Sequence, residues 1–196
     1  MNLHYVLLSI SISATLLFSA CASEGGTQPK NSTDSATLIS DVKNADNLLR
    51  SDTTGVFDPQ KAQQALTAYE KYLAALPQDA EAPAYLFKSA EIYRSLRNFP
   101  KAVEVYQSVY DKFPQSENAP KALFLMAFCY DEDMGNKEKA KSLYQDFLKK
   151  YPQHELANSA QFSLQNIDLT PEQIIKKFEQ QRQDSLKLKA AAKAKK

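Results

Sequence analysis

The chain has 196 residues, which is the size of one domain built around one hydrophobic core. Hydrophobic residues make up 43% of it and charged residues 24%, a composition that is too polar for a protein with several membrane spans. Only four glycines are present, whereas a hairpin-rich β protein usually needs glycine in many of its tight turns. The composition therefore favours helices.

The formal net charge of +1 hides an uneven distribution. Residues 176–196 contain eight basic and two acidic side chains, and the remainder is mildly acidic. A nucleic-acid-binding domain would spread its basic side chains over the folded surface, so we expect no nucleic-acid partner. We interpret the basic end as a solvated helix that frays, with contact to anionic lipid or cell-wall polymer as the alternative.

The first 20 residues predict a signal peptide, because residues 3–20 are apolar or small and contain no acidic or basic group except His4. A transmembrane helix is the alternative by length, although serine and threonine interrupt the apolar run. Residues 17–21 (LFSAC) resemble the lipobox at which bacterial lipoproteins are cleaved and lipidated on cysteine. The resemblance implies that Cys21 carries lipid. An ordinary signal peptide followed by an incidental cysteine is the other interpretation.

Residues 21–35 are nearly free of apolar side chains and predict a flexible tether, because such a segment buries too little surface to offset the entropy of ordering it. Lipid on Cys21 would attach the protein to a membrane without crossing it. The expected location is the periplasmic side of the cell envelope, with the outer membrane as the expected membrane. Cys129 then has no intramolecular partner, and its apolar surroundings predict an inert buried thiol.

The body of the chain repeats itself. Residues 81–116 align with residues 117–154 at an offset of 37 in the first half and 38 in the second, and an earlier, shorter copy spans residues 60–79. Apolar residues within each unit recur every three or four positions in two stripes, which predicts a pair of helices per unit. The alanines let the two helices approach closely, the tyrosines fill the adjacent space and the prolines end the second helix. These matching positions are Ala65, Ala102 and Ala140, Tyr69, Tyr106 and Tyr144, and Pro77, Pro114 and Pro152.

This pattern resembles the tetratricopeptide repeat over roughly residues 40–167, with the family's small residue at Ala90 and Ala127 and its aromatic residue at Tyr93 and Tyr130. The units are longer than the usual 34 residues or so, and Leu86 and its counterpart stand where the family has tryptophan. The resemblance implies an all-α, right-handed solenoid of about three helical hairpins plus a C-terminal closing helix. The long units resemble those of periplasmic bacterial proteins such as the tetratricopeptide lipoprotein of the β-barrel assembly machinery and the cell-division coordinator associated with the Tol-Pal system.

The chain thus divides into a signal peptide (1–20), a tether (21–35), a repeat array (36–169) and a C-terminal helix with a basic tail (170–196). Thr170 and Pro171 are typical of a helix start, and Ile174, Ile175 and Phe178 predict that the closing helix packs on the array. The helices are expected at residues 36–50, 59–76, 81–96, 99–113, 118–132, 136–151 and 155–167, with the closing helix from 170.

The sequence does not favour an enzyme. The part after the signal peptide has one histidine, His154, in a turn, and no glycine-rich phosphate loop or nucleophile turn is present. Residues 131–142 resemble a calcium loop, but the glycine comes one place early and Ser142 stands where a bidentate glutamate is required, so a solvated helix end is the better interpretation. We expect no catalytic residue, metal, cofactor or small-molecule substrate.

Tetratricopeptide arrays usually hold partners on the concave surface lined by the first helix of each hairpin. The resemblance carries that role to Phe87, Glu91, Arg94, Phe124, Phe128 and Asp131, with Lys43, Asn47 and Arg50 continuing the surface. Three phenylalanines bordered by charges suit an extended or helical peptide. The alternative is that the rings belong to the core under the closing helix. The expected function is an adaptor for an envelope protein or peptide; a structural subunit of an outer-membrane or cell-division assembly, without a groove, is the other candidate.

Overall fold

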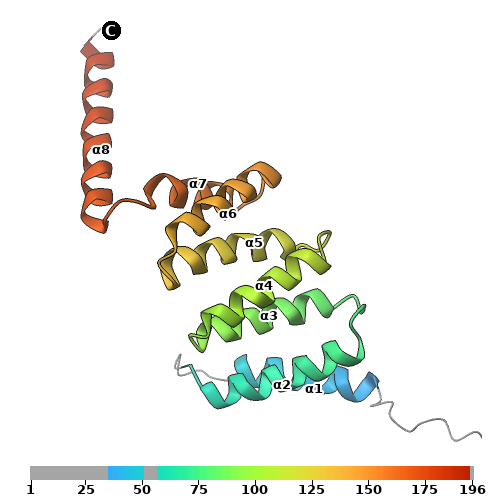
Figure 1. Ribbon diagram of the computed structural model, residues 1–196. Coiled ribbons are helices and arrows are strands. Elements are labelled where there is room, and N and C mark those ends of the chain that lie inside the picture. The colour runs from blue at the N-terminus through green and yellow to red at the C-terminus, as the bar shows by residue number, and fades with distance from the viewer. Residues whose placement is uncertain (1–34, 51–56, 195–196) are drawn as a thin grey trace, which may run out of the picture. The chain divides into compact units, whose positions relative to one another are not determined.

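The computed structural model describes residues 35–50 and 57–194, and residues 33–196 form one compact unit. The predicted signal peptide, the predicted lipidation site Cys21 and the predicted tether lie outside the described residues, except for Ser35, which begins the first helix. Every regular element in the described ranges is helical (Figure 1). In chain order these elements are α1 (Ser35–Arg50), α2 (Pro59–Ala75), α3 (Ala82–Ser95), α4 (Phe99–Lys112), α5 (Asn118–Phe128), the π-helix η1 (Cys129–Asp133), α6 (Lys137–Lys150), α7 (Ala157–Asn166) and α8 (Pro171–Ala194).

Consecutive helices pack as hairpins, α1 with α2, α3 with α4 and α5 with α6, and each hairpin stacks on the next. The predicted helical solenoid is confirmed, and the predicted helices match the observed ones to within one or two residues at nearly every end. We call α1, α3, α5 and α7 the first helices and α2, α4 and α6 the second helices.

The same polar position starts each second helix. The side-chain oxygen of Asp58 accepts hydrogen bonds from the amides of Gln60 and Lys61, and the oxygens of Asn98 and Asn136 each accept one from the amide three residues later. These caps satisfy amides that have no partner inside the helix. The turns between first and second helices are therefore fixed locally.

A second polar position fixes the turns before α3, α5 and α7, with a different residue type in each. The side chains of Asp79, Ser116 and His154 each accept a hydrogen bond from the amide two residues later, over 2.9, 3.2 and 3.1 Å. Carboxylate, hydroxyl and neutral imidazole nitrogen are all acceptors of suitable reach. His154 is thus a turn-forming residue.

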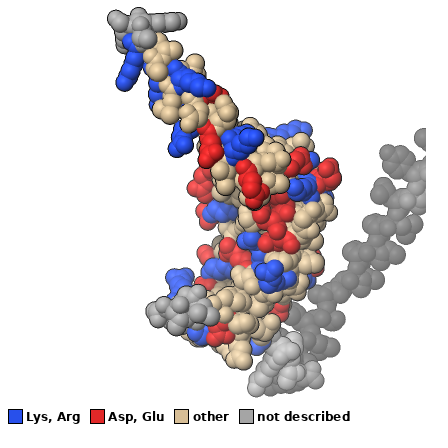
Figure 2. All heavy atoms as spheres, turned by 90° about the vertical axis from the view of Figure 1, so that its left-hand side faces the viewer, with Lys and Arg blue, Asp and Glu red and all other residues tan. Residues whose placement is uncertain are grey.

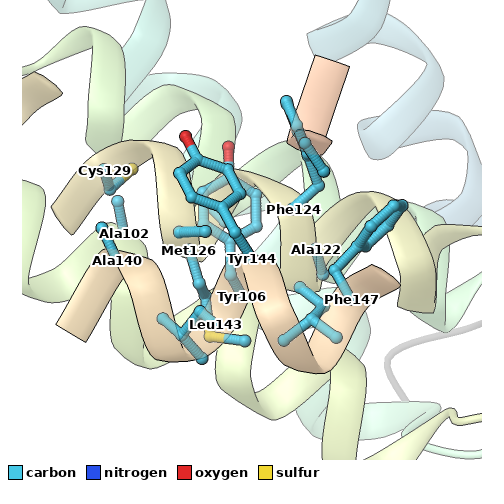
Figure 3. Packing of buried hydrophobic residues seen from close by; sticks show 14 of the residues in the cluster. Ala102, Tyr106, Ala122, Phe124, Met126, Cys129, Ala140, Leu143, Tyr144 and Phe147 are labelled. Carbon is cyan, nitrogen blue, oxygen red and sulfur yellow. The ribbon is translucent and has the colours of Figure 1, made fainter. Parts of the chain in front are cut away.

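The core follows the repeat register that the sequence predicts. Ala65, Ala102 and Ala140 are fully buried, and so, beside them, are the tyrosines at the matching positions, Tyr69, Tyr106 and Tyr144. In the larger hydrophobic cluster, Ala102 and Ala140 lie with Cys129 at one end and Phe124 and Phe147 at the other (Figure 3). Close approach at alanine and filling by tyrosine therefore hold each hairpin together.

The predicted helix 118–132 instead ends in the π-helix η1. Within it the amide of Met134 donates to the carbonyl of Cys129, five residues earlier, and Gly135 follows with φ of 64°. Cys129 is buried, as predicted, and burial raises the pKa of its thiol to about 12. The wider turn moves the acidic residues that follow away from the positions that a regular α-helix would give them.

The C-terminal helix α8 starts where the sequence predicts. Thr170 and Gln173 exchange hydrogen bonds between side chain and backbone, and Pro171 is the first helical residue. The prediction that α8 packs on the array through Ile174, Ile175 and Phe178 holds only at the base of the helix. Ile174 is half-buried beside α7 and Phe178 stacks on Phe162, but Ile175 and Phe178 remain 58% and 49% exposed. Its contacts with the array are confined to its first two turns, so α7 packs on α6 but has no following helix packed along it as the partner of a fourth hairpin.

Candidate protein-interaction face

The first helices α1, α3 and α5, with η1, form one face of the array. We call it the first-helix face and define it by six side chains that are at least partly exposed: Asp46, Lys88, Glu91, Arg94, Phe128 and Asp133. α3 lies between α1 and α5, and its charged residues reach in both directions.

On one side, an ion pair joins α3 to α1. Lys88 Nζ lies 2.7 Å from a carboxylate oxygen of Asp46, and the other oxygen accepts a hydrogen bond of 2.5 Å from the Tyr69 hydroxyl of α2. Burial, and then this hydrogen bond, raise the pKa of Tyr69, so the hydroxyl stays a donor. Asp46 thus connects three helices of two hairpins.

On the other side, α3 is joined to η1. Arg94 Nε donates to one Asp133 oxygen over 2.6 Å and Nη2 lies 3.4 Å from the other, a two-point pairing that fixes both side chains. The same guanidinium lies over the Phe128 ring, 4.7 Å from its centroid. The π-helix brings Asp133 into this position.

A cavity of about 240 Å³ opens between α1 and α3 on this face. Its apolar wall is formed by Leu49 and Ile92, and charged or polar side chains surround them. An apolar floor with a charged border is the arrangement that peptide-binding surfaces use. The remaining lining residues are Asp46, Arg50, Tyr69, Lys88, Glu91 and Ser95.

Comparison with known protein families agrees with this geometry. Residues 58–117, which contain α2, α3 and α4, match a sequence model of the tetratricopeptide repeat, and residues 121–154, from α5 to the turn after α6, match a second one. The chain contains tetratricopeptide repeats. Such repeats generally mediate contacts between proteins. No curated protein matches the chain in a sequence search.

The tetratricopeptide register separates the three phenylalanines that were predicted to line one surface. Phe124 is buried against Tyr144 and Phe147, with ring centroids 5.8 Å from each, so it belongs to the core. Phe87 is half-buried against Tyr106, and only Phe128 lies on the first-helix face with a charged neighbour. Phe87 and Phe124 thus pack on the second helix of their own hairpin and not under α8.

Of the predicted charged residues, Glu91 and Arg94 lie on the first-helix face and Asp131 does not. Asp131 lines a different cavity, of about 290 Å³, between η1, α7 and the start of α8. Sequence reasoning missed Asp46, Lys88 and Asp133, whose ion pairs span about one repeat. Opposite charges on successive first helices were the available signal. Lys43, Asn47 and Arg50 are exposed on α1, and Arg50 borders the first cavity.

Two further observations concern the described residues only. None of their helices is long and apolar enough to span a bilayer. Among the same residues, no group of three or more histidine, cysteine or acidic side chains is arranged so that it could hold a metal ion.

Proposed function

We propose that the protein is a non-catalytic adaptor of the bacterial cell envelope that holds a partner protein or peptide on its first-helix face. The observation that carries the proposal is the cavity between α1 and α3, with Leu49 and Ile92 at its floor and charged side chains at its border. The tetratricopeptide repeats support a protein as the partner. The signal-peptide and lipobox resemblance of residues 1–21 supports the envelope location.

The ion pairs on this face are suited to recognition because they are already formed. Asp46 and Lys88, and Arg94 and Asp133, hold each other in fixed positions, so an arriving chain meets ordered charges and loses less side-chain entropy on binding. Phe128 beneath Arg94 offers a flat apolar contact beside them. Specificity would come from these charges and affinity from the apolar floor.

The structural-subunit alternative requires an apolar surface on the second helices. In the described part of the chain, none of the large exposed apolar side chains lies in α2, α4 or α6. This distribution favours the adaptor over a subunit that is buried in an assembly through its second helices.

Site-specific photocrosslinking tests the adaptor proposal. A photoreactive amino acid is placed in the full-length chain at Glu91, on the first-helix face, or at Glu104, an exposed glutamate of the second helix α4 that serves as the matched control. Irradiation of cells that make the protein should give a discrete adduct with one envelope protein from position 91 and none from position 104. Adducts from position 104 alone, or from neither position, would contradict the proposal.

A further inference from the structure

The end of the array has an uncovered apolar patch. α7 follows the third hairpin as a further first helix, but α8 leaves it after the stacking of Phe162 on Phe178, with ring centroids 5.9 Å apart, and the hydrogen bond from Lys177 Nζ to Asn166. Phe162 remains 45% exposed, and Ile175 lies one turn before Phe178 on α8. We call Phe162, Ile175 and Phe178 the end patch. Three large apolar side chains that share one exposed surface favour an interface.

Acidic side chains gather beside this patch (Figure 2). Asp131 and Glu132 line the cavity of about 290 Å³ next to Phe162, and Asp168 and Glu138 share Lys141 close by. Burial, and then the charge of Glu132, raise the pKa of Asp131, while Lys137 lowers it. We call Asp131, Glu132, Glu138 and Asp168 the acidic rim.

The complementary charge lies on α8, beyond the reach of the same copy's acidic rim. Lys187, Lys189 and Lys193 lie in the last eight residues of a 24-residue helix that is about 36 Å long at 1.5 Å per residue. Lys187 also pairs with Asp184, one turn before it, over 3.8 Å. Its direction is set at the base by the Thr170–Gln173 capping and by Lys177. A straight helix therefore carries its lysines roughly 25 Å away from the rim beside its base. Figure 2 shows basic side chains along the length of α8.

We propose that two copies of the chain pair through α8. Each α8 lies across the end patch of the other copy, so that the lysines of one copy meet the acidic rim of its partner. The two copies are then related by a two-fold axis, and the end patch and acidic rim of each copy contact the α8 of the other. This closed arrangement is typical of homodimers. Folding α8 back within one copy would break the capping and the Lys177 contact, whereas pairing between copies preserves them.

Measurement of mass in solution tests the pairing. The unit 33–196 contains both hydrophobic clusters in full, so it has the complete described core and can be studied alone, with circular dichroism as the check of folding. Sedimentation equilibrium should give a dimer for this unit. The double change Ile175→Ala with Phe178→Ala should raise the dimer dissociation constant on the order of 100-fold. Phe57→Ala is the matched control, because Phe57 is 45% exposed at the opposite end of the array and should leave the dimer unchanged.

Charge reversal tests the orientation. We expect a weaker dimer from the double change Asp131→Lys with Glu132→Lys, and also from the double change Lys187→Glu with Lys189→Glu. All four changes in one chain should restore the dimer, because each copy then presents reversed charges to a partner whose charges are also reversed. A monomer at every concentration, a dimer that is insensitive to the end-patch double change, or no rescue by the fourfold variant overturns the proposal. Binding of a monomer to anionic vesicles through α8 also overturns it, and would assign the helix to a membrane surface.

Discussion

Tyr69 and Asp46 are joined by a hydrogen bond of 2.5 Å that crosses the first hairpin, and the same carboxylate holds Lys88 of the second hairpin. We therefore expect Asp46→Ala to lower the free energy of unfolding by about 2 kcal/mol, because it leaves the buried Tyr69 hydroxyl without an acceptor. Asp46→Asn keeps an acceptor and should cost less, and Lys88→Ala, which removes a partly exposed charge, should cost under about 1 kcal/mol. Urea denaturation measures all three; equal losses for all three would show that the hydrogen bond contributes little.

Ala102 tests the repeat register. It is fully buried where α3 and α4 touch, so Ala102→Leu should destabilise the protein by about 1–3 kcal/mol through overpacking. Ala75→Leu is the control, since Ala75 is exposed at the end of α2. An unchanged denaturation midpoint for Ala102→Leu would contradict the packing described for this position.

His154 should be replaceable by the residues that occupy its position in the other units. His154→Asp and His154→Ser both keep an acceptor for the amide of Leu156, as Asp79 and Ser116 do for theirs, and should change stability little. His154→Ala removes the acceptor and should cost about 0.5–2 kcal/mol. Thermal unfolding distinguishes the variants, and a loss as large for the aspartate as for the alanine would argue against the turn-forming role.

Alkaline pH should destabilise the fold. Burial raises the pKa of the Cys129 thiol from 9.0 to about 12, and burial raises the pKa of Tyr144 from 10.0 to about 12. The unfolded chain therefore loses these protons first, and the free energy of unfolding should fall as pH rises from about 9 to 12. Cys129→Ala should make the fall shallower between pH 9 and 10. A slope that is the same with and without the thiol would contradict this assignment.

The envelope location depends on Cys21, which lies outside the described residues. We expect radiolabelled palmitate to be incorporated into the wild type and not into Cys21→Ser in the bacterial host. Cys129→Ser serves as the control and should still be labelled, because Cys129 is buried in the core. Equal labelling of the wild type and Cys21→Ser would exclude lipidation at this residue.

The helices could be predicted from the sequence because their signals are local and repeated. The apolar spacing, the alanine and tyrosine positions and the caps at Asn98 and Asn136 recur in each unit, and each acts within a few residues. The packing partners of the first-helix face are not local. The burial of Phe124 depends on α6, and the pairing of Arg94 with Asp133 depends on a neighbouring hairpin; a residue pattern in one helix specifies neither.

The C-terminal helix shows the same limit. Its start could be predicted, because capping by Thr170 involves only adjacent residues. Its apolar residues also predict burial, but they do not say against which surface, and within one copy the structure leaves Ile175 and Phe178 exposed. Amphipathic character predicts that a helix has a partner surface without identifying the partner.

The π-helix accounts for the change of offset between the two aligned units. The first helices match at 37 residues and the second helices at 38, so one additional residue lies between Tyr130 and Asn136, where η1 is found. In the shorter unit the amide of Asn98 donates to the carbonyl of Tyr93, and in the longer one that of Asn136 donates to Tyr130, so the same bond closes a loop with one more residue. The added residue lies in the wide turn of η1, which also contains Asp133, the partner of Arg94. The one-residue difference between the two units therefore coincides with an ion pair that joins neighbouring hairpins.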